Sequence, residues 1–200
     1  MSVRGASAQR WNHNIHYHSL VLDAILENAR SALDVGTGNG LLAADLRRKV
    51  PEVVGIDVDE PVLNSARREN DGVTWILGDV MDYPFGRTFD VVASVAVLHH
   101  LPDLSAALRR FAELTAPGGV VIVVGLARST RVADFALDAV GVVQHQWLSR
   151  RRHFWEHSAP TVWPPAHTYR EVRESAMREL PGASWRRLPM FRYALTWRNE

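Results

Sequence analysis

Short apolar runs and amphipathic stretches alternate along most of the chain. The apolar runs are rich in β-branched residues, are bounded by Gly, Asp or Pro, and cover residues 32–35, 53–56, 73–77, 89–95 and 120–124. Between them, apolar positions recur with helical spacing in residues 41–50, 61–70 and 104–115. Strands that alternate with helices in this way are typical of βαβ units, so the pattern predicts a parallel sheet covered by helices.

The pattern changes after residue 125. Residues 126–168 are rich in aromatic residues, Arg and His and predict an insertion, whereas residues 169–180 have helical spacing again. Two alternating runs, 184–188 and 191–197, meet at Pro189-Met190 and predict an antiparallel hairpin. We expect a single α/β domain over residues 1–200, made of an N-terminal arm and helix (1–30), a core (31–125), a lid insertion (126–168), and a last helix with the terminal hairpin (169–200).

Composition excludes several classes of protein. The 200 residues are 46% hydrophobic and 22% charged, which is typical of one folded domain. No apolar run reaches the roughly 18 residues of a membrane span, and the N-terminus lacks the pattern of a signal peptide, so we expect a cytoplasmic protein with no membrane partner. Because the chain has no cysteine, disulfides, zinc–thiolate sites and cysteine nucleophiles are excluded.

Charge is distributed unevenly along the chain, although the formal net charge is only +1. Acidic side chains outnumber basic ones in residues 1–125, and the reverse holds in residues 126–200. The only basic triple, Arg150-Arg151-Arg152, is weak beside a dedicated nucleic-acid-binding protein. We therefore favour a solvated basic face over a nucleic-acid partner.

The strongest local signal is Asp34-Val35-Gly36-Thr37-Gly38-Asn39-Gly40, which lies between a predicted strand and a predicted helix. Glycine lets the backbone turn tightly and approach a ligand, and the helix that follows offers unpaired N–H groups. These glycines alternate, whereas the pyrophosphate fingerprint of dinucleotide folds is G-x-G-x-x-G. An acid two residues before the first glycine suits a ligand with a cationic centre or an ammonium group, and S-adenosylmethionine has both.

Acidic residues also end the next two predicted strands. Asp57 comes 21 residues after Gly36, where an acid accepts hydrogen bonds from ribose hydroxyls in nucleotide-binding α/β folds. Asp59 competes for this role, but its position is typical of the cap of the next helix. Asp79 is placed to accept from an adenine amino group, with Val80 offering its backbone, although an Asp in this position is more often a turn residue.

Taken together, these residues resemble the class I S-adenosylmethionine-dependent methyltransferases, particularly the small-molecule branch that includes ubiquinone and menaquinone biosynthesis methyltransferases. The resemblance covers about residues 31–125 in five ordered motifs, ALDVGTGNG, VVGIDVDEPVL, ILGDVMDYPF, FDVVASVAVLHHLPD and LTAPGGVVIVVG. It implies a Rossmann-like three-layer sandwich with a seven-stranded, mostly parallel sheet of strand order 3-2-1-4-5-7-6. It also implies S-adenosylmethionine as the cofactor and a small molecule as the methyl acceptor.

The resemblance assigns a part of the cofactor to each motif. The implied binding residues are Asp34, Gly36, Thr37, Gly38 and Gly40 for the methionine part, Asp57 for the ribose with Val58 next to it, Asp79 and Val80 for the adenine, and Ser94 and Val95 beside the donor methyl. Direct in-line displacement at a sulfonium methyl depends mainly on proximity and orientation. We therefore assign no catalytic residue.

Histidines are the remaining candidates for chemistry. His99 and His100 titrate in a range that suits a general base, but we favour a structural turn after the fourth strand. The others gather in the N-terminal arm and the insertion, at His13, His16, His18, His145, His153, His157 and His167. A metal site at His153 and His157 is the less favoured interpretation, and we expect none. We expect instead that the arm and the insertion fold over the cofactor and form the acceptor pocket.

The tryptophans of the insertion leave two interpretations open. Trp147, Trp155 and Trp163 either line the acceptor pocket or pack the lid onto the core. Aromatic side chains supply large apolar contact areas, so an apolar or aromatic acceptor is one expectation, with the Arg150–Arg152 triple drawing in an acidic group.

Three other functions are weighed against methyl transfer. A cofactor-binding module without turnover is compatible with the glycine loop, which indicates binding rather than catalysis. A nucleic-acid base methyltransferase is disfavoured because Ser94-Val95-Ala96-Val97 stands where an Asn/Asp-Pro-Pro-Tyr/Phe motif would. Nicotinamide oxidoreduction is disfavoured by the glycine spacing.

Overall fold

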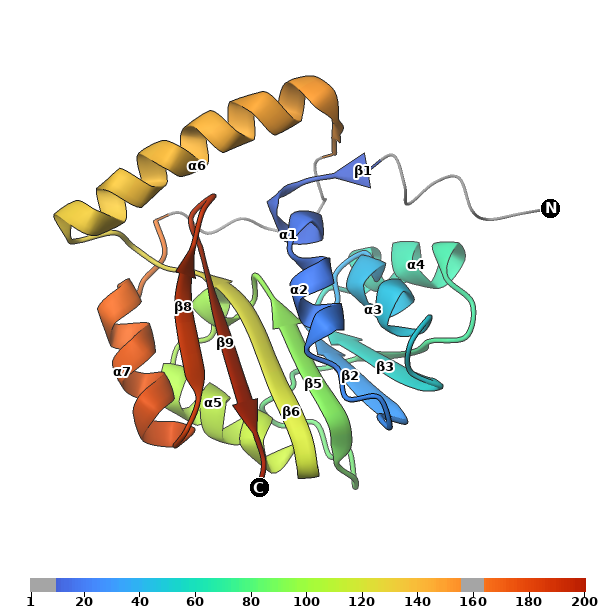
Figure 1. Ribbon diagram of the computed structural model, residues 1–200. Helices are drawn as coiled ribbons and strands as arrows, with labels where there is room; N and C mark the ends of the chain where they lie inside the picture. The colour runs from blue at the N-terminus through green and yellow to red at the C-terminus, as the bar shows by residue number, and fades with distance from the viewer. Residues whose placement is uncertain (1–9, 156–163) are drawn as a thin grey trace.

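The computed structural model describes residues 10–155 and 164–200. Five strands form a parallel sheet: β2 (Ser31–Val35), β3 (Glu52–Asp57), β4 (Thr74–Leu77), β5 (Phe89–Val95) and β6 (Thr115–Leu126). Apart from the edge strand β4, their central residues are almost all buried and apolar, as expected of strands that are covered by helices on both faces. Parallel strands place their carboxyl ends at one edge of the sheet, which is the upper edge in Figure 1.

The predicted hairpin completes the sheet as β8 (Ser184–Leu188) and β9 (Arg192–Arg198). Strand β9 lies antiparallel between β6 and β8, which gives the order β4-β3-β2-β5-β6-β9-β8 and confirms the predicted order of seven strands. The turn contains Met190 and Phe191 with φ of 53° and 61°. Non-glycine residues rarely adopt positive φ, and Met190 does so while fully buried.

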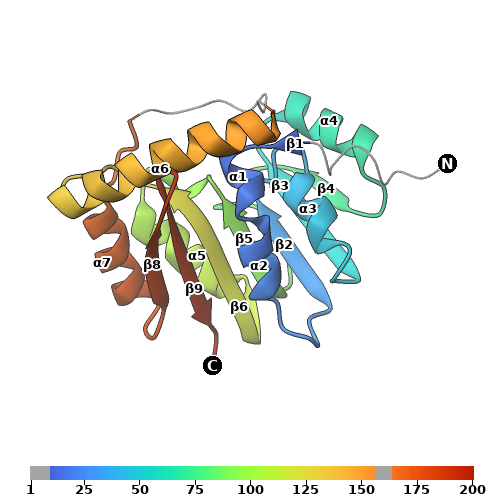
Figure 2. The same cartoon turned by 45° about the horizontal axis from the view of Figure 1, so that its top comes forward.

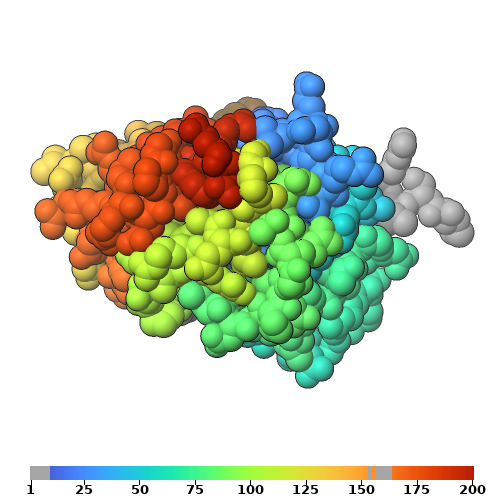
Figure 3. Space-filling model, turned by 90° about the horizontal axis from the view of Figure 1, so that it is seen from below, coloured from blue at the N-terminus to red at the C-terminus, as the bar shows by residue number. Residues whose placement is uncertain are grey.

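Helices cover both faces of the sheet and make three layers. One face carries α5 (Leu104–Glu113) and α7 (Tyr169–Glu179), and the other carries α2 (His18–Asp23) and α3 (Leu41–Leu46). Helix α4 (Glu60–Glu69) packs beside β4. Figure 3 shows the amino-terminal edge of the sheet, where α7 and the hairpin (orange and red) lie beside α5 and β6 (yellow-green). The three-layer α/β sandwich is therefore confirmed.

Two predicted boundaries need correction. The first predicted helix, 41–50, ends at Leu46, because turns follow and Pro51 disfavours helical backbone at the residue before it. The predicted strand 120–124 is longer, Thr115–Leu126. Its first residue pairs with Phe89, and the ladder then shifts register so that Val91 pairs with Val120. The Pro-Gly-Gly segment therefore interrupts a ladder rather than preceding one.

The insertion contains a long helix that the sequence pattern did not indicate, α6 (Val132–Arg151), which lies across the upper edge of the sheet (Figure 2). Gly141 lets it approach the hairpin turn, because an added Cβ would lie 2.6 Å from the backbone nitrogen of Met190. Ion pairs from Arg187 to Asp138 and Asp134 join α6 to β8. Beyond α6, β7 (His153–Phe154) pairs with β1 (Arg10–Trp11), which precedes α1 (His13–His16).

Within the described ranges, no helix is long and apolar enough to cross a bilayer.

Candidate functional site

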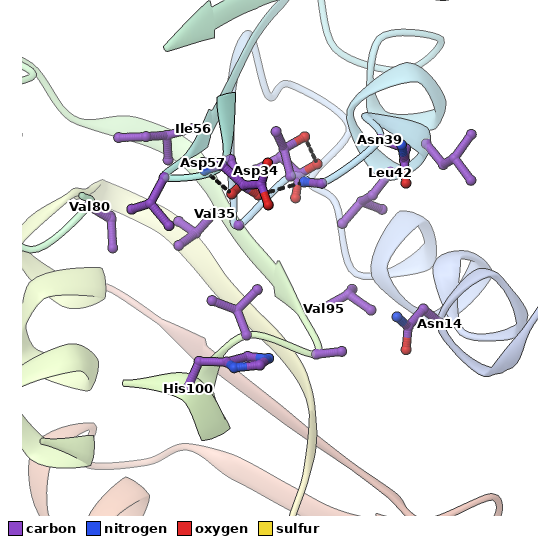
Figure 4. Close-up of a pocket in the computed structure, with 18 of the residues that line it drawn as sticks. Asn14, Asp34, Val35, Asn39, Leu42, Ile56, Asp57, Val80, Val95 and His100 are labelled. Atoms are coloured by element: carbon purple, nitrogen blue, oxygen red, sulfur yellow. Dashed lines mark hydrogen bonds between the residues drawn. The ribbon is translucent and has the colours of Figure 1, made fainter. Parts of the chain in front are cut away.

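A cavity of about 930 Å³ opens at the carboxyl edge of the sheet. Its wall is made by the ends of β2, β3, β4 and β5 with the loops that follow them and by α1 with the residue before it. The first residues of α2, α3 and α4 and single residues from β6, β9 and the insertion complete it. In open α/β sheets, ligands bind outside the carboxyl ends of the strands. Figure 4 shows Asp34 and Asp57 side by side in this wall, with Asn14 and His100 across the cavity.

The glycine loop after β2 is held in a shape that other residues would strain. Gly36, Gly38 and Gly40 have φ of 65°, 55° and 74°. A Cβ at Gly36 would also lie 2.2 Å from a methyl carbon of Val97. The backbone nitrogens of Gly36 and Thr37 both donate to the carbonyl of Ile56, at 2.9 and 3.0 Å. The loop is thus attached to β3 and passes directly along the cavity.

Asp34 supplies a buried carboxylate beneath this loop. It is 2% exposed, lines the cavity, and accepts a hydrogen bond of 2.6 Å from the Thr37 hydroxyl. Burial raises the pKa of Asp34 to about 7, although the Thr37 hydrogen bond acts in the opposite direction. No Lys, Arg or His of the described residues forms an ion pair with it. A cationic ligand would supply the missing charge.

Asp57 closes β3 and holds the loop from the other side. One carboxylate oxygen accepts from the Gly38 backbone nitrogen at 2.8 Å, and the other accepts from the Asp59 nitrogen at 3.0 Å. Asp59 itself caps α4, because its side chain accepts from the Val62 nitrogen at 3.1 Å. The interpretation of Asp59 as a helix cap is therefore confirmed, although Asp59 lines the cavity together with Asp57 and Asp34.

The remaining predicted residues do not all reach the cavity. Val58, Asp79, Val80 and Val95 line it. Val58 is 69% exposed at the mouth, and Asp79 forms a turn in which its side chain accepts from the Met81 nitrogen at 2.9 Å.

Gly40 and Ser94 lie outside the wall. A Cβ at Gly40 would lie 2.4 Å from the Trp75 ring, so this glycine serves close packing. The Ser94 hydroxyl is fully buried and has no hydrogen-bond partner among the described residues.

His99 and His100 do form the predicted turn, a 3-10 helix η1 (Leu98–His100), but they also line the cavity. Burial lowers the pKa of His99 to about 4, and the charges of His100 and Arg192 act in the same direction. His99 is therefore neutral at pH 7.

The arm and the insertion contact each other, and each contributes residues to the cavity wall. The ring nitrogens of His13 and His145 share a hydrogen bond of 2.8 Å, and Trp11 stacks on His145 at a centroid distance of 6.1 Å. Trp155 lines the cavity, whereas Trp147 is 52% exposed and stacks with Arg151 instead. The predictions for Trp163 and His157 lie outside the described residues.

Several wall residues have no local motif and were missed from the sequence. They are Asn12, Asn14 and Ile15 in the arm, Leu126 at the end of β6, and Arg192 at the start of β9. Asn12 caps α1 by accepting from the nitrogens of Asn14 and Ile15, which turns this segment over the cavity. Within the described residues, no group of three His, Asp or Glu side chains is placed to hold a metal ion.

Comparison with known proteins gives consistent results. Residues 33–123 match the family described as "Methyltransferase domain". An uncharacterized methyltransferase of Mycobacterium bovis is 41% identical over 194 residues, which cover 95% of this chain and 98% of the relative. A ubiquinone biosynthesis O-methyltransferase of Azorhizobium caulinodans is 34% identical over 134 residues, which cover 62% of this chain and 51% of that enzyme. The chain therefore matches about half of the latter's length.

Among solved structures, the N-methyltransferase NodS from Bradyrhizobium japonicum has a TM-score of 0.63 at 18% identity, covering 92% of this chain and 94% of that one. A second structure of NodS, in complex with S-adenosyl-L-homocysteine, has a TM-score of 0.61 at 17% identity, covering 92% and 86% of the two chains. At this level of identity the likeness concerns the fold.

Proposed function

Because this chain belongs to the class I S-adenosylmethionine-dependent methyltransferases, we propose that it transfers the methyl group of S-adenosylmethionine to a small-molecule acceptor by direct displacement. The observation that carries the proposal is a buried, unpaired carboxylate, Asp34, beside a glycine loop in a cavity of about 930 Å³. That volume lies at the upper end of the roughly 300–1,000 Å³ range of ligand pockets. It leaves room for a cofactor and a small acceptor together.

The residues present fit the cofactor. The ammonium group of its methionine part compensates the charge of Asp34, and the Gly36–Gly38 backbone allows close approach. In the arrangement implied by the family motifs, Asp57 binds the ribose hydroxyls, while Asp79 and the backbone of Val80 bind the adenine.

The same arrangement leaves Val95 beside the donor methyl, since Val95 lines the cavity at the end of β5. Ser94 acts only through packing, because its hydroxyl is buried outside the wall.

When bound, S-adenosylmethionine supplies an electrophilic methyl group on a sulfonium centre. The residues of the chain position the two reactants. The loop and Asp34 orient the methyl donor, and the arm and the insertion exclude water and hold the acceptor in line with it. The new bond joins the methyl carbon to an acceptor nucleophile while the carbon–sulfur bond breaks. His99, neutral at pH 7, is not needed as a base for an acceptor that is already nucleophilic.

Small-molecule acceptors are also named for relatives, such as the ubiquinone biosynthesis O-methyltransferase of Azorhizobium caulinodans, which supports the same class here. The test is to incubate the protein with methyl-labelled S-adenosylmethionine and a library of small molecules, and to follow label in products. We expect at least one product whose formation is abolished by S-adenosylhomocysteine. Tight S-adenosylhomocysteine binding with no product from any acceptor would instead favour a binding module without turnover.

We also propose that the described residues of the insertion cover the acceptor. Trp155 lines the cavity and Trp147 does not, so the two form a matched pair. We expect Trp155→Ala to reduce acceptor turnover at least tenfold, with S-adenosylhomocysteine affinity within twofold of wild type. Trp147→Ala should leave turnover unchanged. If both variants lost turnover equally, in proportion to a fall in melting temperature, these tryptophans would only pack the insertion onto the core.

A further inference from the structure

Arg192, the first residue of β9, is a buried cation in the cavity wall. It is 6% exposed. Its Nη2 donates to the side-chain oxygen of Asn14 at 2.8 Å, and its Nη1 donates to the Met190 carbonyl at 3.4 Å. Its Nε is buried and has no hydrogen-bond partner among the described residues. No carboxylate in the described part of the chain forms an ion pair with it.

The surroundings of Arg192 do not compensate its charge. Buried charges in proteins are normally paired, because desolvation is costly. Here burial lowers the pKa of Arg192 to about 10. Burial also raises the pKa of Tyr17 and of Tyr169 to about 12, so neither phenol supplies an anion at neutral pH. The nearby His13, with its pKa lowered to about 4 chiefly by burial, is neutral. Among the described residues, no anion therefore compensates the charge of the Arg192 guanidinium.

Arg192 has more donors than its described neighbours use. A guanidinium has five N–H donors, and two of them are used by Asn14 and Met190. The Nε–H has no partner among the described residues. A guanidinium in a cavity wall can bind a carboxylate through charge-assisted hydrogen bonds.

Sheet topology separates this cation from the cofactor end of the cavity. Asp34 and Asp57 end β2 and β3, whereas Arg192 pairs with Leu126 at the end of β6, two strands beyond β5. Neighbouring strands lie about 4.8 Å apart, and Arg192 is two residues further along the ladder than the position level with Val95, so the two backbones are roughly 12 Å apart. One end of the cavity thus carries the carboxylates of Asp34 and Asp57 among others, and the other end carries a guanidinium.

We propose that Arg192 binds a carboxylate of the methyl acceptor, so that the substrates are small organic acids whose apolar part rests against Leu126 and Trp155. The inference rests on the proposed methyl transfer and adds the substrate class. A carboxylate in this cavity has two sources, because the methionine part of the cofactor also carries one. The position of Arg192 beyond β6 favours the acceptor.

The test observes Arg192 directly. In ¹⁵N-labelled protein saturated with S-adenosylhomocysteine, the Arg192 Nε–H resonance is assigned by its loss in Arg192→Lys. Acetate, malonate and phenylacetate are then titrated, each beside its amide. We expect at least one acid to shift the resonance saturably and its amide to bind at least tenfold more weakly. If S-adenosylhomocysteine alone already moves the resonance to its limit, or if no acid moves it, the proposal is wrong.

Variants add an independent readout. We expect Arg192→Gln to raise the KM of an acidic acceptor at least tenfold and to leave S-adenosylhomocysteine affinity within twofold. The exposed Arg150 provides the matched control, and Arg150→Gln should change neither quantity. Equal effects of the two variants would overturn the assignment to Arg192. The resonance shift needs no turnover, so it remains readable if methyl transfer itself fails.

Discussion

The pH dependence of cofactor binding follows from the burial of Asp34. Its pKa in the unliganded protein is raised to about 7 by burial, and an ammonium group binds the ionised form. About one molecule in ten has Asp34 ionised at pH 6, and about nine in ten at pH 8. We therefore expect the Kd of S-adenosylhomocysteine to fall about tenfold from pH 6 to pH 8. In the bound state we expect the ligand cation to lower the pKa of Asp34.

Calorimetry measures two consequences of this linkage. Binding at pH 6 should release more protons than binding at pH 8, when the heat is measured in buffers of different ionisation enthalpy. Asp34→Asn keeps an acceptor for the Thr37 hydroxyl but cannot titrate. In this variant we expect a flat pH profile and, at pH 8, a loss of about 1.5–3 kcal/mol, the range for a hydrogen bond to a charged group.

The stability of the unliganded protein should change in the opposite direction. The folded-state pKa of Asp34 lies above its ordinary value of 3.8, so its contribution to stability is complete below about pH 4 and is lost as pH rises through 7. That contribution to the free energy of unfolding is at most about 4 kcal/mol.

A Kd that stays within twofold between pH 6 and 8 would show that Asp34 does not bind the cation. An Asp34→Asn variant whose Kd depends on pH as steeply as that of the wild type would show the same.

Two other changes test the cofactor end of the cavity. Asp57→Ala should weaken the binding of S-adenosylhomocysteine by about 1–3 kcal/mol, as measured by calorimetry. Asp59→Ala should instead lower the free energy of unfolding by about 1 kcal/mol, because a helix cap is lost, and leave Kd unchanged. If calorimetry and thermal melts gave the reverse result, the roles of the two residues would be exchanged. Gly36→Ala should abolish measurable binding, because its Cβ would overlap Val97, while Gly86→Ala, also at positive φ but with open space, should cost stability only.

The core of the fold was predictable because each strand is short, apolar and bounded by turn residues. Helix α6 was not, for a physical reason: its apolar residues do not form one stripe. Val132, Phe135, Val143 and Trp147 are exposed, and the helix is attached through Leu148, Gly141 and two aspartates rather than through an apolar face. Helical periodicity indicates a helix only when one face packs on a core.

The part of the cavity wall around Asp34 and Asp57 was predictable from local motifs, because these acids and the glycines each occur at a strand end within a recognisable pattern. The contacts between the arm and the insertion were not, since they join residues far apart in the chain. His13 and His145 share a hydrogen bond across 132 positions, and nothing in either segment specifies the other. Composition indicated only that two His-rich segments exist.

Arg192 was missed for a topological reason. A search for ligand-binding residues at the ends of strands finds Asp34, Asp57 and Val95, because parallel strands bring their last residues to the ligand-binding edge. Strand β9 is antiparallel to β6, so it brings its first residue there instead. In a sheet that ends with an antiparallel hairpin, the residue that begins the inner strand of that hairpin belongs to the same edge as the residues that end the parallel strands. Including this position brings Arg192 into the set of residues expected in the cavity wall.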